Sequence, residues 1–187
     1  MIWNDIWNNK NLIKTLKEGG VAVMPTDTLY GVVGKALSQS TVDRIYRLRK
    51  RNPEKPCIIL IGDKNELKKF EIVPTKAQKN EIRKYKKPTS FIVECTDKKF
   101  KYLHRGTGTL AFRMPSVKAL QDLLLKVGPL IAPSANPEGL FPAQTLSEAE
   151  GYFGNSVDLY IDGGIIESKA SKVIKLHSDG SRTVLRV

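Results

Sequence analysis

The chain has 187 residues, of which 41% are hydrophobic and 27% are charged. These fractions are typical of an ordinary soluble globular protein and exclude a disordered or fibrous chain. No apolar run approaches the roughly eighteen residues that a membrane helix needs. The first residues, Met1 to Asp5, lack the basic and apolar regions of a signal peptide. We therefore expect a cytoplasmic protein that does not bind a membrane.

The charge balance and the number of cysteines limit the classes of partner and of metal site that we expect. The 31 basic and 19 acidic residues give a net charge of +12 and a pI near 9.7. Such an excess attracts polyanions, which makes nucleotides or nucleic acids reasonable partners, although a general bias of composition would produce the same excess. Cys57 and Cys95 are too few for a disulfide framework or a four-ligand zinc cluster. We therefore expect no metal held by the protein.

In chain order, apolar runs alternate with stretches of helical periodicity. We expect helices over residues 9–18, 41–51, 75–85, 116–127 and 145–153. We expect strands over residues 21–24, 57–61, 90–94, 110–114 and 130–132, with three more near Leu159, Val173 and Val184. Ser40 and Ser116 are placed to cap helices, and Thr145 with Glu148 fits a capping box. The chain, residues 1–187, therefore predicts a single mixed α/β domain around a twisted, mostly mixed sheet flanked by helices.

Several well-known kinds of site are missing from the sequence. It contains no G-x-x-x-x-G-K-S/T phosphate loop and no G-x-G-x-x-G after a strand. His104 and His177 have no His or Cys at ligand spacing, so we interpret both as surface residues. No nucleophile stands beside a recognisable activating base. The chemistry must therefore rest on other groups.

Three polar segments remain, at residues 25–31, 49–56 and 132–139. Ligands bind just past the strands of open α/β sheets. The first segment could instead cap a helix, the cations of the second also fit a solvated helix C-terminus, and the third could be a simple turn. If the three segments form a binding site, the cations of the second segment would hold nucleotide phosphates. The prolines of the third segment would stiffen a polar ledge for the ligand.

Short motifs follow one another in the sequence at residues 25–31 (P-T-D-T-L-Y-G), 49–56 (R-K-R-N-P-E-K-P), 110–115 (L-A-F-R-M-P), 134–139 (S-A-N-P-E-G), 171–174 (S-K-V-I) and 185–186 (L-R). Together they resemble the threonylcarbamoyl-AMP synthase family of the YrdC/TsaC type, over essentially the whole chain. The family patterns at these places are P-T-D/E-T-x-Y-G, K-x-R with a following basic or amide residue, L-A-x-R-x-P, S-A-N-x-S-G, S-T-V-I/V and L-R. Three positions depart from them: Arg49 and Glu138 stand in place of a lysine and a serine, and Lys172 stands in place of a threonine.

The resemblance implies a nucleotidyltransferase that forms threonylcarbamoyl-AMP and pyrophosphate from L-threonine, bicarbonate and ATP. This is the first step of threonylcarbamoyl-adenosine modification of tRNA. Such a transfer depends on positioning and on neutralised charge, so it needs no protein nucleophile. Mg²⁺ would arrive with ATP and be held by phosphates and water, without a dedicated protein site. The resemblance also implies tRNA threonylcarbamoyl-transferase proteins as downstream partners, and contact with tRNA or double-stranded RNA through the basic surface.

The resemblance also assigns roles within a basic concave cleft. Catalytic roles fall to Arg49, Arg51, Ser134 and Asn136. These four are also expected to bind ATP, together with Lys55, Thr109 and Arg186. Threonine binding is assigned to Thr26, Thr28, Arg113 and Ser171.

Two other interpretations of the sequence remain open. The chain could be an RNA-binding module of the same fold, which would bind RNA with a steep dependence on salt and consume no ATP. The sequence lacks the surface aromatic residues that single-strand binders use for stacking, which counts against a sequence-specific version. It could also be a related carbamoyl-adenylate domain without this activity.

Overall fold

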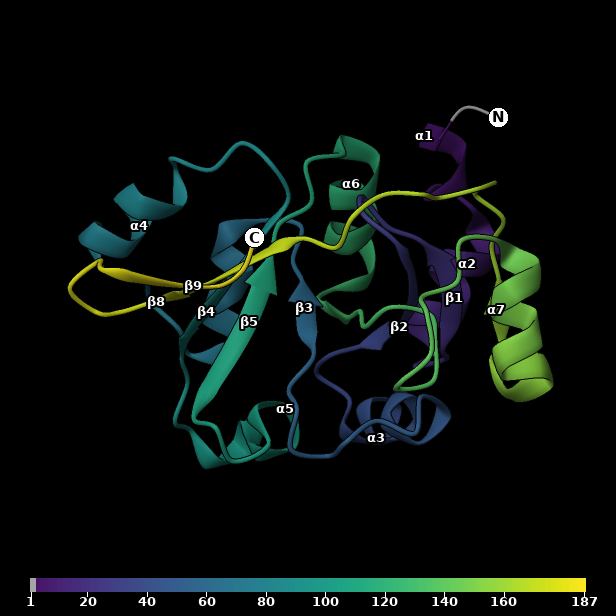
Figure 1. Cartoon of the computed structure of the whole chain (residues 1–187), viewed down its shortest axis with the longest axis horizontal. Coiled ribbons are helices and arrows are strands. Elements are labelled where there is room, and N and C mark those ends of the chain that lie inside the picture. The colour runs from purple at the N-terminus through teal and green to yellow at the C-terminus, as the bar shows by residue number, and fades with distance from the viewer. Residues whose placement is uncertain (1–2) are drawn as a thin grey trace.

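Short apolar strands join into one mixed sheet at the centre of the structure (Figure 1). The computed structural model describes residues 3–187. Met1 and Ile2, the first residues of the segment that lacks signal-peptide features, lie outside the described residues. The strand order is β7-β1-β2-β6-β3-β5-β4-β8-β9, which confirms the expected mixed α/β class. The strands are β1 (Ala22–Pro25), β2 (Tyr30–Lys35), β3 (Ile58–Leu60), β4 (Thr89–Glu94), β5 (Thr109–Arg113), β6 (Leu130–Ile131), β7 (Leu159–Tyr160), β8 (Lys172–Leu176) and β9 (Arg182–Arg186).

Helices cover both faces of the sheet. The apolar sides of α2 and α6 share one hydrophobic core, whereas those of α3 and α5 belong to the core on the other face. Within residues 3–187, no helix is both long and apolar enough to cross a membrane. The helices are α1 (Trp3–Ile6), α2 (Lys10–Lys17), α3 (Gln39–Leu48), α4 (Lys76–Ile82), α5 (Lys101–His104), α6 (Lys118–Val127) and α7 (Leu146–Phe153), with 3-10 segments η1 (Lys64–Phe70), η2 (Lys98–Phe100) and η3 (Gly154–Ser156).

Successive residues of the central strands enter different cores, because side chains alternate between the two faces of a strand. Val23 and Ile59 pack on the α3 side, whereas Met24 and Leu60 pack on the α6 side. The sheet is therefore covered on both faces here, as the unbroken apolar run at residues 57–61 predicts.

Strand β2 was not predicted from the sequence. It pairs antiparallel with β1 from Pro25↔Tyr30 to Ala22↔Val33, so residues 26–29 form a tight connection between the two strands. From the sequence, the polar motif at residues 25–31 indicates either a binding segment after a strand or a helix cap; in the structure its last two residues, Tyr30 and Gly31, already belong to a buried strand. The motif is thus held rigidly at the end of a hairpin.

Two helices begin differently from the expected caps. In α3, Ser38 rather than Ser40 accepts the hydrogen bond of the Thr41 N–H, and Ser40 lies inside the helix. Helix α6 begins at Lys118 without a side-chain cap, because Ser116 lies two residues before it. A hydroxyl residue near a helix start predicts the turn, but not which of several neighbours supplies the cap.

A buried carboxylate joins α4 to the C-terminal strand. The Glu81 carboxylate accepts hydrogen bonds from Lys84 Nζ at 2.6 Å and from Arg182 of β9. These two hydrogen bonds lower the pKa of Glu81 to about 2, and the bond from Lys84 has the larger effect. The ion pairs fix α4 over the edge of the sheet.

This lowered pKa predicts a specific acid sensitivity. Because the pKa of Glu81 is lower in the folded than in the unfolded chain, its contribution to stability is present above the ordinary pKa of 4.5 and is lost as the pH falls through about 2. Glu81→Gln should flatten the pH dependence of the unfolding free energy in that range, as measured by urea denaturation at several pH values. The exposed control Glu94→Gln should leave it unchanged; equal slopes in wild type and Glu81→Gln would contradict the assignment.

Candidate active site

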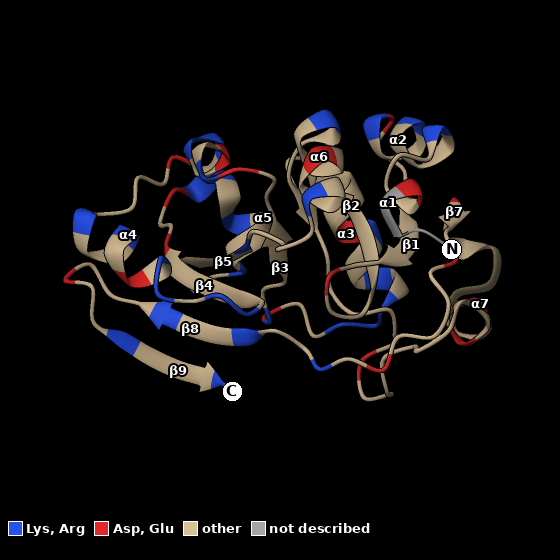
Figure 2. Cartoon of the chain, turned by 90° about the horizontal axis from the view of Figure 1, so that it is seen from above, with Lys and Arg blue, Asp and Glu red and all other residues tan. Residues whose placement is uncertain are grey.

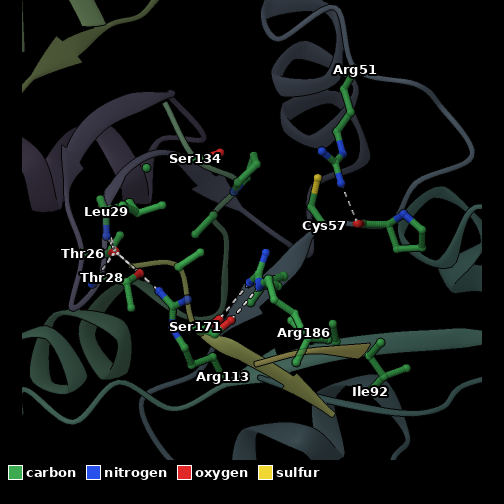
Figure 3. Close-up of a pocket in the computed structure, with 18 of the residues that line it drawn as sticks. Thr26, Thr28, Leu29, Arg51, Cys57, Ile92, Arg113, Ser134, Ser171 and Arg186 are labelled. Carbon is green, nitrogen blue, oxygen red and sulfur yellow. Dashed lines mark hydrogen bonds between the residues drawn. The ribbon is translucent and has the colours of Figure 1, made fainter. Parts of the chain in front are cut away.

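Segments far apart in the sequence converge on a cavity of about 380 Å³ (Figure 3). Its wall combines the turn after β1, the end of α3, the face of β5, the loop after β6 and the end of β9. Nine of the predicted site residues lie on this wall. They are Thr26, Thr28, Arg49, Arg51, Thr109, Arg113, Ser134, Ser171 and Arg186.

The end of α3 directs two arginines into the site. The helix closes with the Arg51 N–H donating to the carbonyl of Tyr46 and the Lys50 N–H donating to that of Arg47. Lys50 has φ +47°, in the left-handed region in which helices commonly end. Arg49, at the C-cap, is thereby placed inside the protein, and Arg51 follows the turn onto the cavity wall.

Arg49 ties this helix end to the loop after β6. It is 3% exposed, and its guanidinium donates to the Asn136 carbonyl at 2.9 Å, to Asn136 Oδ1 at 3.1 Å and to Ser134 Oγ at 3.3 Å. Burial, and then the charge of Arg51, lower its pKa to about 10. Only a planar guanidinium offers donors in this fork, so the arginine that replaces the family's lysine gains a structural task. Its buried Nη1 has no hydrogen-bond partner within residues 3–187.

Arg51 reaches the cavity from the turn after α3, and Arg186 reaches it from β9 (Figure 3). Arg51 donates to the carbonyls of Lys55 and Pro56, each at 3.0 Å. Arg186 donates to the Ser171 carbonyl at 2.7 Å and to Ser171 Oγ at 3.3 Å. Burial lowers the pKa of Arg186. Neither arginine is paired with a carboxylate among residues 3–187.

A β-bulge in β9 gives Arg186 its direction. Val173 of β8 pairs with Arg186 but the next residue, Ile174, pairs with Val184, so Leu185 is an extra residue in β9. Arg182 reaches Glu81 on the α4 side, and in a regular strand a residue four positions later would face the same way. The extra residue reverses the alternation, and Arg186 turns to the cavity.

A buried ion pair stands behind the opposite wall. Arg113 Nη2 lies 2.9 Å from Asp27 Oδ1, and the two side chains are only 5% and 1% exposed. The same nitrogen donates to Thr26 Oγ1 at 3.4 Å. Burial lowers the pKa of Arg113, and the Asp27 carboxylate opposes that shift. Asp27 is not assigned a role from the sequence; its position between two threonines in a polar motif is the signal that could have found it.

Two pairs of hydroxyl groups lie beside arginines of the cavity wall. Thr26 Oγ1 lies 3.2 Å from Thr28 Oγ1, and Ser171 Oγ lies 2.9 Å from Ser90 Oγ. Both pairs belong to buried residues beside Arg113 and Arg186. The site therefore offers hydroxyl donors and acceptors next to its cations.

Two predicted residues stand outside the cavity wall. Asn136 turns its amide to Arg49 and to the carbonyls of its own loop. Lys55 is exposed and forms an ion pair with Glu138 at 2.7 Å. Glu138, which stands in place of a serine in the family pattern, therefore engages this lysine. The hydrogen bonds of Lys55 and of the Asn52 N–H lower the pKa of Glu138.

The cavity is cationic as a whole. Its wall carries four arginines and no Asp or Glu, and it also includes the apolar side chains of Ile58, Ile92 and Val173. Within residues 3–187, no cluster of three or more His, Cys, Asp or Glu could hold a metal ion. His104, expected at the surface, is instead buried, with Nδ1 accepting the Gly106 N–H. Such a wall suits a polyanion together with a small hydroxylated ligand.

Comparisons with known proteins match this architecture. The Sua5/YciO/YrdC family, described as telomere recombination, matches residues 14–187. A threonylcarbamoyl-AMP synthase of Dichelobacter nodosus is 27% identical over 187 residues, covering 98% of this chain and 96% of the relative. The crystal structure of YciO from E. coli superposes with a TM-score of 0.79 at 26% identity, covering 98% of this chain and 89% of that one.

A longer structure shares the fold alone. Sua5 of Pyrococcus abyssi, solved in complex with L-threonine, superposes with a TM-score of 0.85 at 24% identity. The match covers 97% of this chain but 54% of that protein, so the present chain spans about half of its length.

The bulge in β9 makes a testable demand on the sequence. Deleting Leu185 should remove the bulge and leave Arg186 directly after Val184, still paired with Val173 and facing the cavity. We therefore expect the deletion to bind ATP within about twofold of wild type, whereas Arg186→Ala should weaken binding about tenfold or more, because only the substitution loses a charged donor. Isothermal titration with ATP measures both affinities. A loss of affinity in the deletion as large as that of Arg186→Ala would contradict this register.

The buried pair behind the cavity should stabilise the fold. Asp27→Asn leaves the Arg113 charge buried without its partner, which should lower the unfolding free energy by about 3 kcal/mol. The control Asp122→Asn breaks the exposed Lys118–Asp122 pair and should cost less than about 1 kcal/mol. Urea denaturation at pH 7 compares them, and equal losses would refute the special role of Asp27.

Proposed function

This chain belongs to the Sua5/YciO/YrdC family, and on that premise we propose that it forms threonylcarbamoyl-AMP and pyrophosphate from L-threonine, bicarbonate and ATP. It would thus be a nucleotidyltransferase that catalyses the first step of threonylcarbamoyl-adenosine modification of tRNA. The proposed place of action is the cytoplasm, and the proposed downstream partners are tRNA threonylcarbamoyl-transferase proteins. The name of the Dichelobacter relative supports the proposal.

The observation that carries the proposal is the chemistry of the cavity wall. Four arginines without a carboxylate on the wall suit a triphosphate, and buried hydroxyls beside Arg113 suit a small amino acid that bears a hydroxyl and a carboxylate. One cavity of about 380 Å³ would hold the reacting ends of both substrates together.

The proposed reaction needs no covalent intermediate with the protein. Threonine and bicarbonate give a carbamate and water. A carbamate oxygen then attacks the α-phosphorus of ATP, the bond to the bridging oxygen breaks, and pyrophosphate leaves with the electron pair. Fixed cations that neutralise the charge on pyrophosphate lower the barrier to such a step.

The geometry supports separate roles for the arginines. We assign Arg51 and Arg186 to the triphosphate, because their other partners are neutral carbonyls and a hydroxyl. Arg113, with Thr28 and Ser171 nearby, would receive the threonine carboxylate. Arg49 would act chiefly by fixing the loop that presents Ser134 to the nucleotide.

The remaining predicted contacts are peripheral. Thr26 would hold Arg113 in place, and Thr109 would meet the nucleotide from the face of β5. Asn136 would shape its loop. Lys55 could reach a phosphate only after releasing Glu138.

The wall of the cavity also bears on Mg²⁺. It offers guanidinium and hydroxyl groups but no carboxylate, which fits an ion carried in by ATP and ligated by phosphate oxygens and water. There the ion would offset phosphate charge, while the arginines orient the chain of phosphates.

Pyrophosphate release from ATP tests the activity directly. The proposal requires release that depends on both threonine and bicarbonate, each omitted in turn. Release without threonine would indicate a related carbamoyl-adenylate domain. No release, together with RNA binding that falls steeply with salt, would indicate an RNA-binding module.

One substitution tests the assignment of the phosphate site. Arg51→Ala should reduce kcat/KM for ATP by an amount equivalent to about 2–4 kcal/mol, because it removes a donor to developing charge. The control Arg47→Ala removes an exposed arginine from the last turn of α3, just before Arg51, and should retain wild-type kinetics. Adenylate formation at a near wild-type rate by Arg51→Ala would rule out this role.

A further inference from the structure

A second hollow lies on the face of β4 and β5 opposite the cavity. Two adjoining depressions of about 550 and 340 Å³ share Leu67 and lie between α4, η1 and the sheet; we call them together the α4 groove. Phe91 and Phe112 line this groove, whereas their neighbours Ile92 and Arg113 line the cavity. Alternation along the strands therefore separates two sites, back to back.

The interior of the α4 groove is apolar and largely aliphatic. Val73 and Met114, which are 74% and 40% exposed, belong to its wall. The ring of Tyr85 meets that of Phe91 edge to face, with centroids 5.5 Å apart, and Phe112 is similarly engaged with another ring. Because these rings pack against one another, they offer no stack of free faces of the kind that binds nucleic-acid bases. The aliphatic wall suits side chains of a peptide, and an exposed methionine adapts to several shapes.

The rim of the α4 groove is strongly basic. One carboxylate, that of Asp63, lies among its lining residues, and it caps η1 by accepting the Asn65 N–H. Basic residues at α4 are visible in Figure 2. Six exposed cations of the rim make no ion pair within residues 3–187. They are Lys64, Lys68, Lys79, Arg83, Lys86 and Lys87.

The absence of ion pairs at the rim is not due to a lack of acids nearby. Glu66 and Glu81, on the same two elements, are already paired with Lys69 and Lys84. The rim cations therefore keep their charge toward solvent, and a ligand that matches both the rim and the interior carries acidic and apolar side chains.

We propose that the α4 groove binds an acidic amphipathic segment of a partner protein. Apolar side chains on one side of the segment occupy the groove, and flanking Asp and Glu residues meet the cations of the rim. Charge complementarity of this kind selects the partner and speeds its association, and an amphipathic helix in an apolar groove is a recurrent mode of peptide recognition. The site is independent of the proposed catalytic activity, because it lies on the other face of the sheet.

Fluorescence anisotropy with defined probes tests this proposal. The probe is a labelled 16-residue peptide with Leu at helical spacing and Glu elsewhere, roughly the length of a short interfacial helix. One comparison peptide keeps the leucines and replaces Glu by Lys, and a single-stranded oligouridine RNA of similar charge serves as a second comparison. The variants are Arg83→Glu with Lys86→Glu at the rim, and Met114→Glu in the wall. Lys10→Glu with Lys14→Glu, on exposed residues of α2, makes the same change of charge elsewhere.

The acidic peptide should bind the wild-type protein saturably, and the lysine peptide should not. The rim variant and Met114→Glu should each weaken binding about tenfold or more, and the α2 variant less than about twofold. Circular dichroism confirms that every variant is folded. Absence of binding, equal weakening by both charge reversals, or RNA binding that depends on the rim as strongly as peptide binding does would overturn the proposal.

Discussion

The site depends on how the fold keeps like charges together. Four arginines share the wall of one cavity, and their mutual repulsion must be offset in the folded state. Backbone carbonyl oxygens offset much of this repulsion, since Arg49, Arg51 and Arg186 each donate to at least one of them. Of the four, Arg113 alone is paired with a carboxylate within residues 3–187. Carbonyls orient a guanidinium without cancelling its charge. The cavity therefore stays cationic toward any ligand that enters.

The same constraint explains why the loops of the site are rigid. The carbonyls that anchor the arginines belong to the turn after α3, the loop after β6 and the segment before β8. Arg49 and Arg186 each fix a second part of the chain, and Arg51 closes the turn to which it belongs, so the wall forms as a unit. Arg49 shows this most clearly, because it joins the end of a helix to a loop more than eighty residues away.

The sequence predicted the class of fold, and nine of its candidate site residues lie on the wall of one cavity, since apolar periodicity and short motifs are local signals. It correctly placed Thr145 as a cap, but its partner Glu148 accepts the N–H of Gln144 instead of completing a capping box. The strand β2 was hidden by its polar neighbours. The bulge at Leu185 and the pairing of Asp27 with Arg113 depend on contacts between distant segments, which no local pattern records.

Strand β5 serves two surfaces at once, with Phe112 turned to the α4 groove and Arg113 to the cavity. Natural variation can therefore exchange these side chains individually, and each face can change without the other. Gain or loss of one residue within the strand is a different matter, because the shift would send the guanidinium into the groove and the ring into the cavity. Among descendants of this sequence, length should be held more strictly in β5 than the identity of any residue in it.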